Sequence, residues 1–397
     1  MFFVVVFFVM TLLYGYVGAR VIAPFEISGL GMFLYWIIIV LLATAPILGM
    51  IFRSRGLENL LIDASLWIGF VGMGLFSLAF VAFLLRDLGW ITATISFKIF
   101  KSMTNISTES IQLDPGRRQF LLMSMNLGIV GVTSLLGGIG LFQARRKATI
   151  MPQNITIANL PVEFQGLTIA QISDLHVGPT IKGDYARTVV DQVNALNPDL
   201  IFFTGDMVDG SVDHLSEDVE PLRDLKSKYG TYFVTGNHEY YSGAQQWVNK
   251  VGELGMIHLE NEHRILEKGK ASLAIAGVTD LMAHHTIKSH KSDPQKAMRG
   301  VPEGIPSILL AHQPGTAELT QNLPIDLMVC GHTHGGQYIP FNLAVEKVHK
   351  YSAGLYRHGK MQVYVNQGTG YWGPPLRLGI PSEITLFKLQ GEVDGIS

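Results

Sequence analysis

Two kinds of side chain are scarce in this sequence of 397 residues, and each scarcity excludes a class of protein. A single cysteine, Cys330, excludes disulfide scaffolds and cysteine-based zinc or iron–sulfur sites. Charged residues make up only 16% of the chain, against about a quarter in soluble domains. The net charge of -2 gives no electrostatic basis for binding nucleic acid. Hydrophobic residues, at 48%, and 13 histidines are plentiful, which points to membrane segments and to sites built on imidazole.

The shortage of charge is concentrated before residue 150. Uncharged apolar runs occupy residues 1–19, 30–52, 64–85 and 119–144. Each run is long enough to cross the hydrocarbon core of a bilayer as a helix, which takes about 20 residues. We therefore predict an all-α transmembrane region at 1–147 with four helices, so the lipid bilayer is its partner. No basic segment precedes the first run, so a cleaved signal peptide is not predicted there.

The orientation of these helices is not set by the loops, because basic residues divide six against five between the two sides. The segment Arg117-Arg118-Gln119-Phe120-Leu121 resembles the twin-arginine export signal of bacteria, and a positively charged membrane boundary is the other interpretation. Export by that route favours a multi-pass protein of the bacterial cytoplasmic (inner) membrane. The second half of the chain would then lie outside the cytoplasm, and residues 86–118 inside it.

After Lys147 the sequence alternates short apolar runs with polar helical stretches, which is typical of an α/β domain and predicts one at 152–392. Strands are predicted at 167–172, 200–204, 231–235, 273–278, 308–311 and 327–330, and helices at 185–196, 222–228 and 244–254. Residues 361–365 and 383–389 are expected to close the domain as a strand pair. The segment 280–306 lacks periodicity and is expected to pass over the site.

Polar side chains with metal-binding chemistry stand at the ends of these apolar runs. In open α/β sheets, ligands bind outside the carboxyl ends of the strands. The candidate donors are seven: Asp174, His176, Asp206, Asn237, His312, His332 and His334. Seven oxygen and imidazole donors are too many for one tetrahedral zinc, but they suit two adjacent ions that share a carboxylate. Two such ions acidify a water and clamp an in-line displacement at phosphorus, so we predict two divalent ions, with manganese, iron and zinc all possible.

Five motifs in order carry a resemblance to the calcineurin-like metallophosphoesterases over residues 165–389. They are D-L-H at 174–176, G-D-M-V-D at 205–209, G-N-H-E at 236–239, A-H at 311–312 and G-H-T-H at 331–334. The resemblance implies a four-layer αββα fold, with two sheets packed face to face and helices outside. It also implies one ion held by Asp174, His176, Asp206 and His334, and another held by Asp206, Asn237, His312 and His332. His238 would contact the phosphate and act as a general acid.

Within that family the sequence is more similar to a bacterial membrane-linked branch, the YkuE and YaeI type phosphodiesterases. The evidence is the twin-arginine segment, G-H-T-H-G-G-Q at 331–337 and P-L-R-L-G-I-P-S-E-I at 375–384. Serine/threonine protein phosphatases carry arginine where this chain has Gly210, so that activity is less expected. A related branch cleaves the pyrophosphate of a lipid precursor, which leaves a lipid or cell-envelope substrate open.

The expected function is a membrane-anchored dinuclear phosphoesterase acting on a phosphomonoester, phosphodiester or pyrophosphate bond. The alternative is a non-catalytic, metal-dependent sensing or binding module on a membrane anchor. Glu239 is expected either to orient His238 or a metal water, or to form a surface ion pair, whereas Asp209 is expected to be structural. A glycine-rich loop either lines the mouth of the pocket or serves structural packing, and its residues of interest are Gly368, Tyr371, Trp372 and Arg377. The oligomeric state is not predicted.

Overall fold

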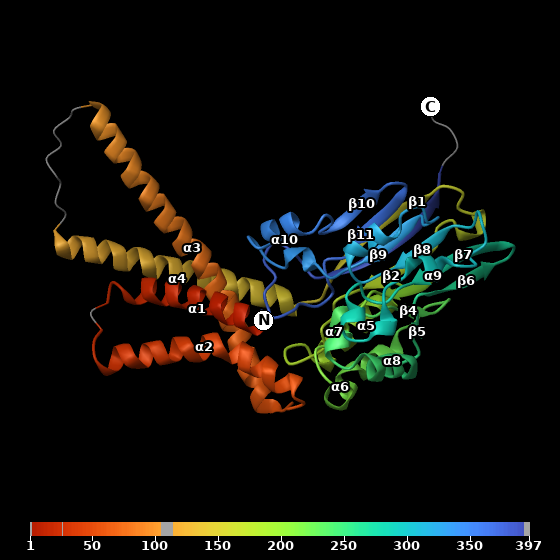
Figure 1. Ribbon diagram of the computed structural model, residues 1–397, viewed down its shortest axis with the longest axis horizontal. Helices are drawn as coiled ribbons and strands as arrows, with labels where there is room; N and C mark the ends of the chain where they lie inside the picture. The colour runs from red at the N-terminus through yellow and green to blue at the C-terminus, as the bar shows by residue number, and fades with distance from the viewer. Residues whose placement is uncertain (1, 26, 105–113, 393–397) are drawn as a thin grey trace. The chain divides into compact units, whose positions relative to one another are not determined.

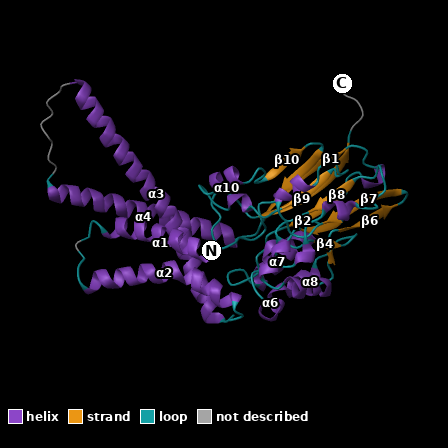
Figure 2. Cartoon of the chain, in the orientation of Figure 1, coloured by secondary structure: helices purple, strands orange, loops and turns teal. Residues whose placement is uncertain are grey.

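The computed structural model describes residues 2–25, 27–104 and 114–392 and divides into two units (Figure 1). The first comprises residues 1–55 and 59–141, and the second comprises residues 56–58 and 142–397. Residue 1 of the first predicted span and residues 105–113 of the predicted cytoplasmic loop lie outside the described residues. The first unit is helical, and the strands all belong to the second (Figure 2).

The first unit has four helices in its described part: α1 (Phe2–Ile22), α2 (Leu30–Ser54), α3 (Leu60–Thr104) and α4 (Pro115–Arg145). The last three are long and apolar enough to cross a membrane. In α1 the apolar helical segment, Phe7–Ile22, is shorter. The chain is therefore a membrane protein with three candidate spans, and a fourth at 1–19 stays a prediction.

Charged side chains divide the long helix α3. Its 45 residues extend about 67 Å, more than twice a hydrocarbon core of about 30 Å. Arg53 Nη1 lies 2.7 Å from Asp63 Oδ1 near its start, and Arg20 Nη2 lies 2.7 Å from Asp87 Oδ2 further along. The 24 residues from Asp63 to Asp87 (87 minus 63) rise about 36 Å, which suits a bilayer crossing between the two ion pairs. The span predicted at 64–85 lies within this helix, which itself continues to Thr104.

The second unit is built on two six-stranded sheets. The first has the order β1-β12-β2-β3-β4-β5, and the second has the order β10-β11-β9-β8-β7-β6. In the first, β2, β3, β4 and β5 are parallel and β12 is antiparallel to β2; in the second, β7, β8, β9 and β11 are parallel. The strands are β1 (Thr149–Ile157), β2 (Thr168–Ile172), β3 (Leu200–Phe203), β4 (Thr231–Phe233), β5 (Ile257–His258), β6 (Glu262–Lys268), β7 (Ala271–Gly277), β8 (Ser307–Leu310), β9 (Leu327–Cys330), β10 (Gly354–His358), β11 (Met361–Val365) and β12 (Glu383–Gly391). The helices are α5 (Gly183–Ala195), α6 (Val212–Val219), α7 (Asn237–Tyr241), α8 (Ala244–Glu253), α9 (Pro294–Met298) and α10 (Asn342–Val348).

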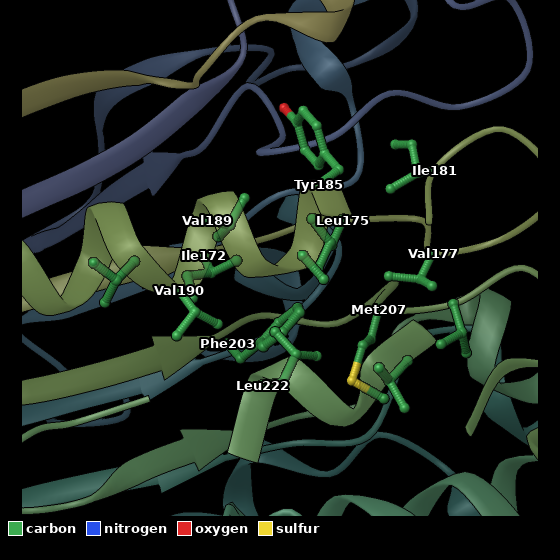
Figure 3. Packing of buried hydrophobic residues seen from close by; sticks show 14 of the residues in the cluster. Ile172, Leu175, Val177, Ile181, Tyr185, Val189, Val190, Phe203, Met207 and Leu222 are labelled. Carbon is green, nitrogen blue, oxygen red and sulfur yellow. The ribbon is translucent and has the colours of Figure 1, made fainter. Parts of the chain in front are cut away.

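Side chains of the central strands point alternately to the two faces of each sheet, and this alternation produces the layers. Leu200 and Phe202 of β3 join a buried cluster with side chains of the opposite sheet, so the two sheets pack face to face. Ile201 and Phe203 point the other way and join a cluster with α5, α6 and α8. Figure 3 shows Phe203 beside Val190 and other side chains of this helical layer. A third cluster covers the outer face of the second sheet and includes Ala297 and Met298 of α9. The predicted αββα sandwich is confirmed.

Two local predictions are wrong. The helix expected at 222–228 is a 3₁₀ turn at Glu220–Asp224, and the helical turns of this connection lie in α6 just before it. The strands expected to pair at the end of the chain belong to different sheets, because β11 lies between β10 and β9 while β12 lies between β1 and β2.

Candidate dinuclear metal centre

The seven predicted donors lie on loops at the carboxyl ends of parallel strands from both sheets. Asp174 and His176 follow β2, Asp206 follows β3, and Asn237 begins α7 just after β4. The second sheet contributes three more, with His312 after β8 and both His332 and His334 after β9. Because the two sheets pack face to face, these loops converge at one end of the sandwich.

Opposed imidazole nitrogens mark two positions within this cluster. His176 Nε2 lies 3.1 Å from His334 Nε2, and His332 Nδ1 lies 3.2 Å from His312 Nε2. Asp206 Oδ2 lies 3.0 Å from His312 Nε2 and 3.8 Å from His176 Nε2, so it reaches both pairs. This arrangement suits a carboxylate shared between two cations.

The remaining carboxylate and amide complete the donor set. Asp174 Oδ1 lies 3.5 Å from His334 Nε2. Asp174, His176 and His334 form one group whose ligand atoms lie within 4.8 Å of one another, and Asp206, His312 and His332 form a second. The side-chain oxygen of Asn237 is buried without a hydrogen-bond partner among the described residues. A buried polar atom normally has a partner, and a cation beside this oxygen would satisfy it.

The electrostatics of two of the histidines favour metal binding. Burial lowers the pKa of His332 to about 3 and the pKa of His334 well below its usual range. Both rings are therefore neutral, which is the form that binds a metal. Burial also lowers the pKa of His312, but the Asp206 carboxylate outweighs burial and raises that pKa well above its usual range. A cation at this position would take the place of the His312 proton as the partner of Asp206. These buried histidine and aspartate clusters are consistent with a dimetal site.

The backbone at the donors is held in an uncommon conformation. Asp174, His176, Asp206, His332 and His334 have positive φ values between 51° and 75°. Such residues cost about 1–3 kcal/mol each and persist where the surrounding structure fixes them, typically at functional sites. Five of the seven predicted donors share this feature, which the side-chain pattern did not reveal.

Asp209 positions two histidines at once. Its Oδ1 lies 3.1 Å from His176 Nδ1 and 2.5 Å from His238 Nδ1. Burial by itself lowers the pKa of His238, but the carboxylates of Asp209 and Asp206 outweigh burial and raise it to about 9. With Nδ1 bonded to Asp209, the other ring nitrogen of His238 points to the cluster, 4.0 Å from Asp206 Oδ2. The sequence favoured a structural over a ligating role for Asp209, and it did not reveal these two hydrogen bonds.

Glu239 holds together the two loops that carry Asp206 and Gly236. Its side chain is fully buried and accepts the backbone N–H groups of Asp206 at 3.0 Å, Met207 at 2.8 Å and Gly236 at 2.7 Å. Burial, followed by the Asp206 carboxylate, raises the pKa of Glu239 to about 8. The prediction that Glu239 could form a surface ion pair is wrong, because this side chain is buried.

Arg377 forms a hydrogen bond with His334, one of the predicted ligands. It is fully buried, and its Nη2 donates to His334 Nδ1 at 3.1 Å and to the Gly370 carbonyl at 2.6 Å. Gly368 adopts φ of +84°, and a Cβ there would lie 2.7 Å from His334 Nδ1, so glycine permits this contact. Sequence reasoning placed Arg377 near the pocket but did not identify its contact with His334.

Two exposed aromatic rings flank His238. The Trp372 ring centroid lies 5.7 Å from that of His238, and the Tyr241 centroid lies 5.4 Å from it. Trp372 therefore borders the site, whereas Tyr371 is buried and donates to the Thr180 carbonyl at 3.0 Å. Part of the segment 280–306 packs behind α7, where Tyr240 Oη lies 2.9 Å from His290 Nδ1.

Comparison with known proteins agrees with this geometry. The family model for calcineurin-like phosphoesterases matches residues 167–336. An uncharacterised metallophosphoesterase of Helicobacter pylori is 36% identical over 287 residues, which cover 71% of this chain and 75% of that protein. The chain belongs to the calcineurin-like phosphoesterase family.

Other relatives of this phosphoesterase differ in how much of their length it covers. The metallophosphoesterase YkuE of Bacillus subtilis is 31% identical over 286 residues, which cover 69% of this chain and 97% of YkuE. A transmembrane protein with a metallophosphoesterase domain from Bos taurus is 39% identical over 274 residues, which cover 66% of this chain. The chain spans only 61% of the length of that bovine relative. The predicted resemblance to this family, including YkuE, is confirmed.

Proposed function

We propose that the second unit hydrolyses a phosphoester bond with two divalent metal ions. The observation that carries this proposal is the Asp206 carboxylate reaching both opposed imidazole pairs, at 3.0 Å and 3.8 Å. Asp174, His176, Asp206 and His334 would hold one ion, and Asp206, Asn237, His312 and His332 the other. Bound ions would supply an acidified water and neutralise charge that develops at phosphorus.

His238 is the general acid in this proposal. Asp209 accepts the proton on Nδ1, so the Nε2 proton faces the cluster and can pass to the leaving oxygen. A pKa of about 9 keeps His238 protonated at neutral pH. The His238 side chain is 15% exposed beside the rings of Trp372 and Tyr241, and a substrate would reach it there.

The proposed substrate is lipid-linked or part of the cell envelope. Helix α4 ends at Arg145 and β1 begins at Thr149, so only residues 146–148 connect a candidate membrane span to the phosphoesterase unit. Three extended residues span about 10 Å, which keeps the unit next to the bilayer. The bond can be a monoester, diester or pyrophosphate, and Gly210 in place of arginine makes a phosphoprotein less suitable.

Metal content and hydrolysis test the proposal together. The full-length protein, purified in detergent and loaded with manganese, should bind two ions per chain and hydrolyse an aryl phosphodiester. Two bound ions with no hydrolysis of monoesters or diesters, under manganese, iron or zinc, would instead favour the non-catalytic binding module.

The proposed location is a bacterial cytoplasmic membrane, with the phosphoesterase unit outside the cytoplasm. The support is the arginine pair Arg117-Arg118 in the first turn of α4, which resembles the twin-arginine signal. A reporter fused to the carboxyl terminus should be active only outside the cytoplasm. Activity of a cytoplasmic reporter at that position would reverse the orientation.

A further inference from the structure

Exposed apolar side chains gather around the metal centre. Beyond residue 145, the described residues expose nine large apolar side chains. Five of them come from three segments at the site, and we name these five the apolar rim: Tyr241, Ile339, Leu343, Val348 and Trp372. Scattered exposed apolar residues are ordinary, whereas a group beside a site marks a place of interaction.

Helix α10 contributes two residues of the apolar rim and buries none of its own side chains. A short helix is marginal in water and is usually stabilised by packing its apolar face. Leu343 is 56% exposed and Val348 is 79% exposed, so these two apolar side chains of α10 face outward. An outward apolar face on a short helix indicates a partner outside the phosphoesterase unit.

Direct contacts join the apolar rim to the metal centre. The His349 ring, next to Val348, lies 5.9 Å from the ring of His332. Gln337 accepts the Trp372 N–H at 2.9 Å and donates to the Trp372 carbonyl at 3.1 Å, which ties that loop to the loop of His334. Whatever covers the apolar rim therefore also faces the metal centre.

The end of a membrane helix is attached beside the same loop. Arg145, the last residue of α4, belongs to the second unit and donates to the Thr180 carbonyl at 2.8 Å. Tyr371 donates to that carbonyl as well, and Ala144 shares a buried cluster with Tyr371. Tyr371 immediately precedes Trp372 of the apolar rim. The uncharged run at 119–144 thus ends beside the loop that carries Trp372.

We infer that the apolar rim contacts the lipid bilayer and presents phosphates of membrane lipids to the metal centre. The bilayer is the occupant because α4, a candidate span, ends beside the Trp372 loop and keeps the lipid surface near it. Tryptophan and tyrosine favour the headgroup region, and leucine, isoleucine and valine favour the acyl boundary beneath it. The substrate class is the phosphodiester or diphosphate of a lipid headgroup, and this part rests on the proposed phosphoesterase function.

Position-specific quenching tests the contact without any use of catalysis. Val348→Cys, labelled with a fluorophore in the full-length protein, is reconstituted in phosphatidylcholine and phosphatidylglycerol vesicles with a spin label near the lipid headgroup. Val162→Cys is the matched control, since Val162 is 81% exposed and Val348 is 79% exposed. Val162 precedes β2, and the metal centre follows the other end of that strand.

The spin-labelled lipid should quench the label at position 348 strongly and the label at position 162 weakly. Equal quenching at both positions overturns the inference. The native Cys330 is buried, so unmodified protein taken through the same labelling gives the background.

Paired substrates test the consequence for turnover. Val348→Asp should lower hydrolysis of a vesicle-borne phosphodiester lipid, relative to a soluble aryl phosphodiester, by about tenfold, as expected for a loss of about 1.4 kcal/mol of binding. Val162→Asp should leave this ratio unchanged. An unchanged ratio in Val348→Asp contradicts the inference. If the unmodified protein hydrolyses neither substrate, the proposed function fails, while the quenching comparison still decides whether the rim meets lipid.

Discussion

Replacing Gly236 by alanine should disable the site although Gly236 binds nothing through a side chain. A Cβ at this position would lie 2.5 Å from the Asp206 backbone nitrogen, 2.8 Å from Asp206 Cγ and closer still to Oδ1. Gly236 has φ of -97°, so alanine adds no backbone strain there and the effect is purely steric. The Asp206 carboxylate would have to move by roughly 1 Å to reach ordinary contact distance.

A movement of that size is large for a metal site. Ligand distances normally stay within about 0.2 Å of their usual values, so Asp206 could no longer serve both positions. A misplacement of about 1 Å costs roughly 100-fold in rate, and we expect Gly236→Ala to lose at least that factor in kcat/KM. Bound metal, measured by elemental analysis, should fall below two ions per chain.

Gly252→Ala is the control for this substitution. Gly252 lies within α8, and a Cβ there would meet nothing within 4 Å. Gly252 lies in the last turn of α8, where alanine restricts the unfolded chain and adds no close contact, so thermal unfolding should shift at most slightly upward with activity unchanged. If Gly236→Ala kept two ions and the activity of the unmodified protein, the assignment of Asp206 as the shared ligand would be refuted.

Five further substitutions separate the roles of the site residues. Asp206→Asn and His332→Ala should abolish hydrolysis and lose metal, as elemental analysis would show. His238→Ala should keep both ions and lower kcat by about 10²–10⁴-fold; an emptied site would contradict its role as general acid. Activity that depends on protonated His238 falls as pH rises through the pKa of that group. Since the Asp209 charge raises that pKa, Asp209→Asn should move the alkaline limb of the kcat profile to lower pH. Glu239→Ala leaves three buried N–H groups without their acceptor, at about 1–3 kcal/mol each, and should markedly lower the unfolding temperature.

The sequence indicated residues that the fold brings together, because each of these polar side chains directly follows an apolar run. Asp206 and His312 are far apart in the chain, yet the rule that parallel strands end at one edge brings their loops together. The central strands were equally accessible, since β9 at Leu327–Cys330 is an uninterrupted apolar run in which all four residues are buried.

Features that depend on tertiary context could not be predicted from the sequence. The strand β1 alternates half-buried and exposed residues along much of its length, so it produced no apolar run to detect. The separation of β11 and β12 into different sheets is a choice of long-range pairing that no local pattern encodes. The burial of Glu239 depends on three backbone groups from two loops, which only the folded chain assembles.

The residues of the proposed centre come from both sheets of the sandwich. His176 from the first sheet faces His334 from the second, and Asp206 from the first meets His312 from the second. Neither sheet alone carries the whole set of predicted ligands, so bound cations would link the two sheets. A chelator should consequently weaken the packing of one sheet on the other. Removal of the ions would then lower the stability of the fold as well as the activity.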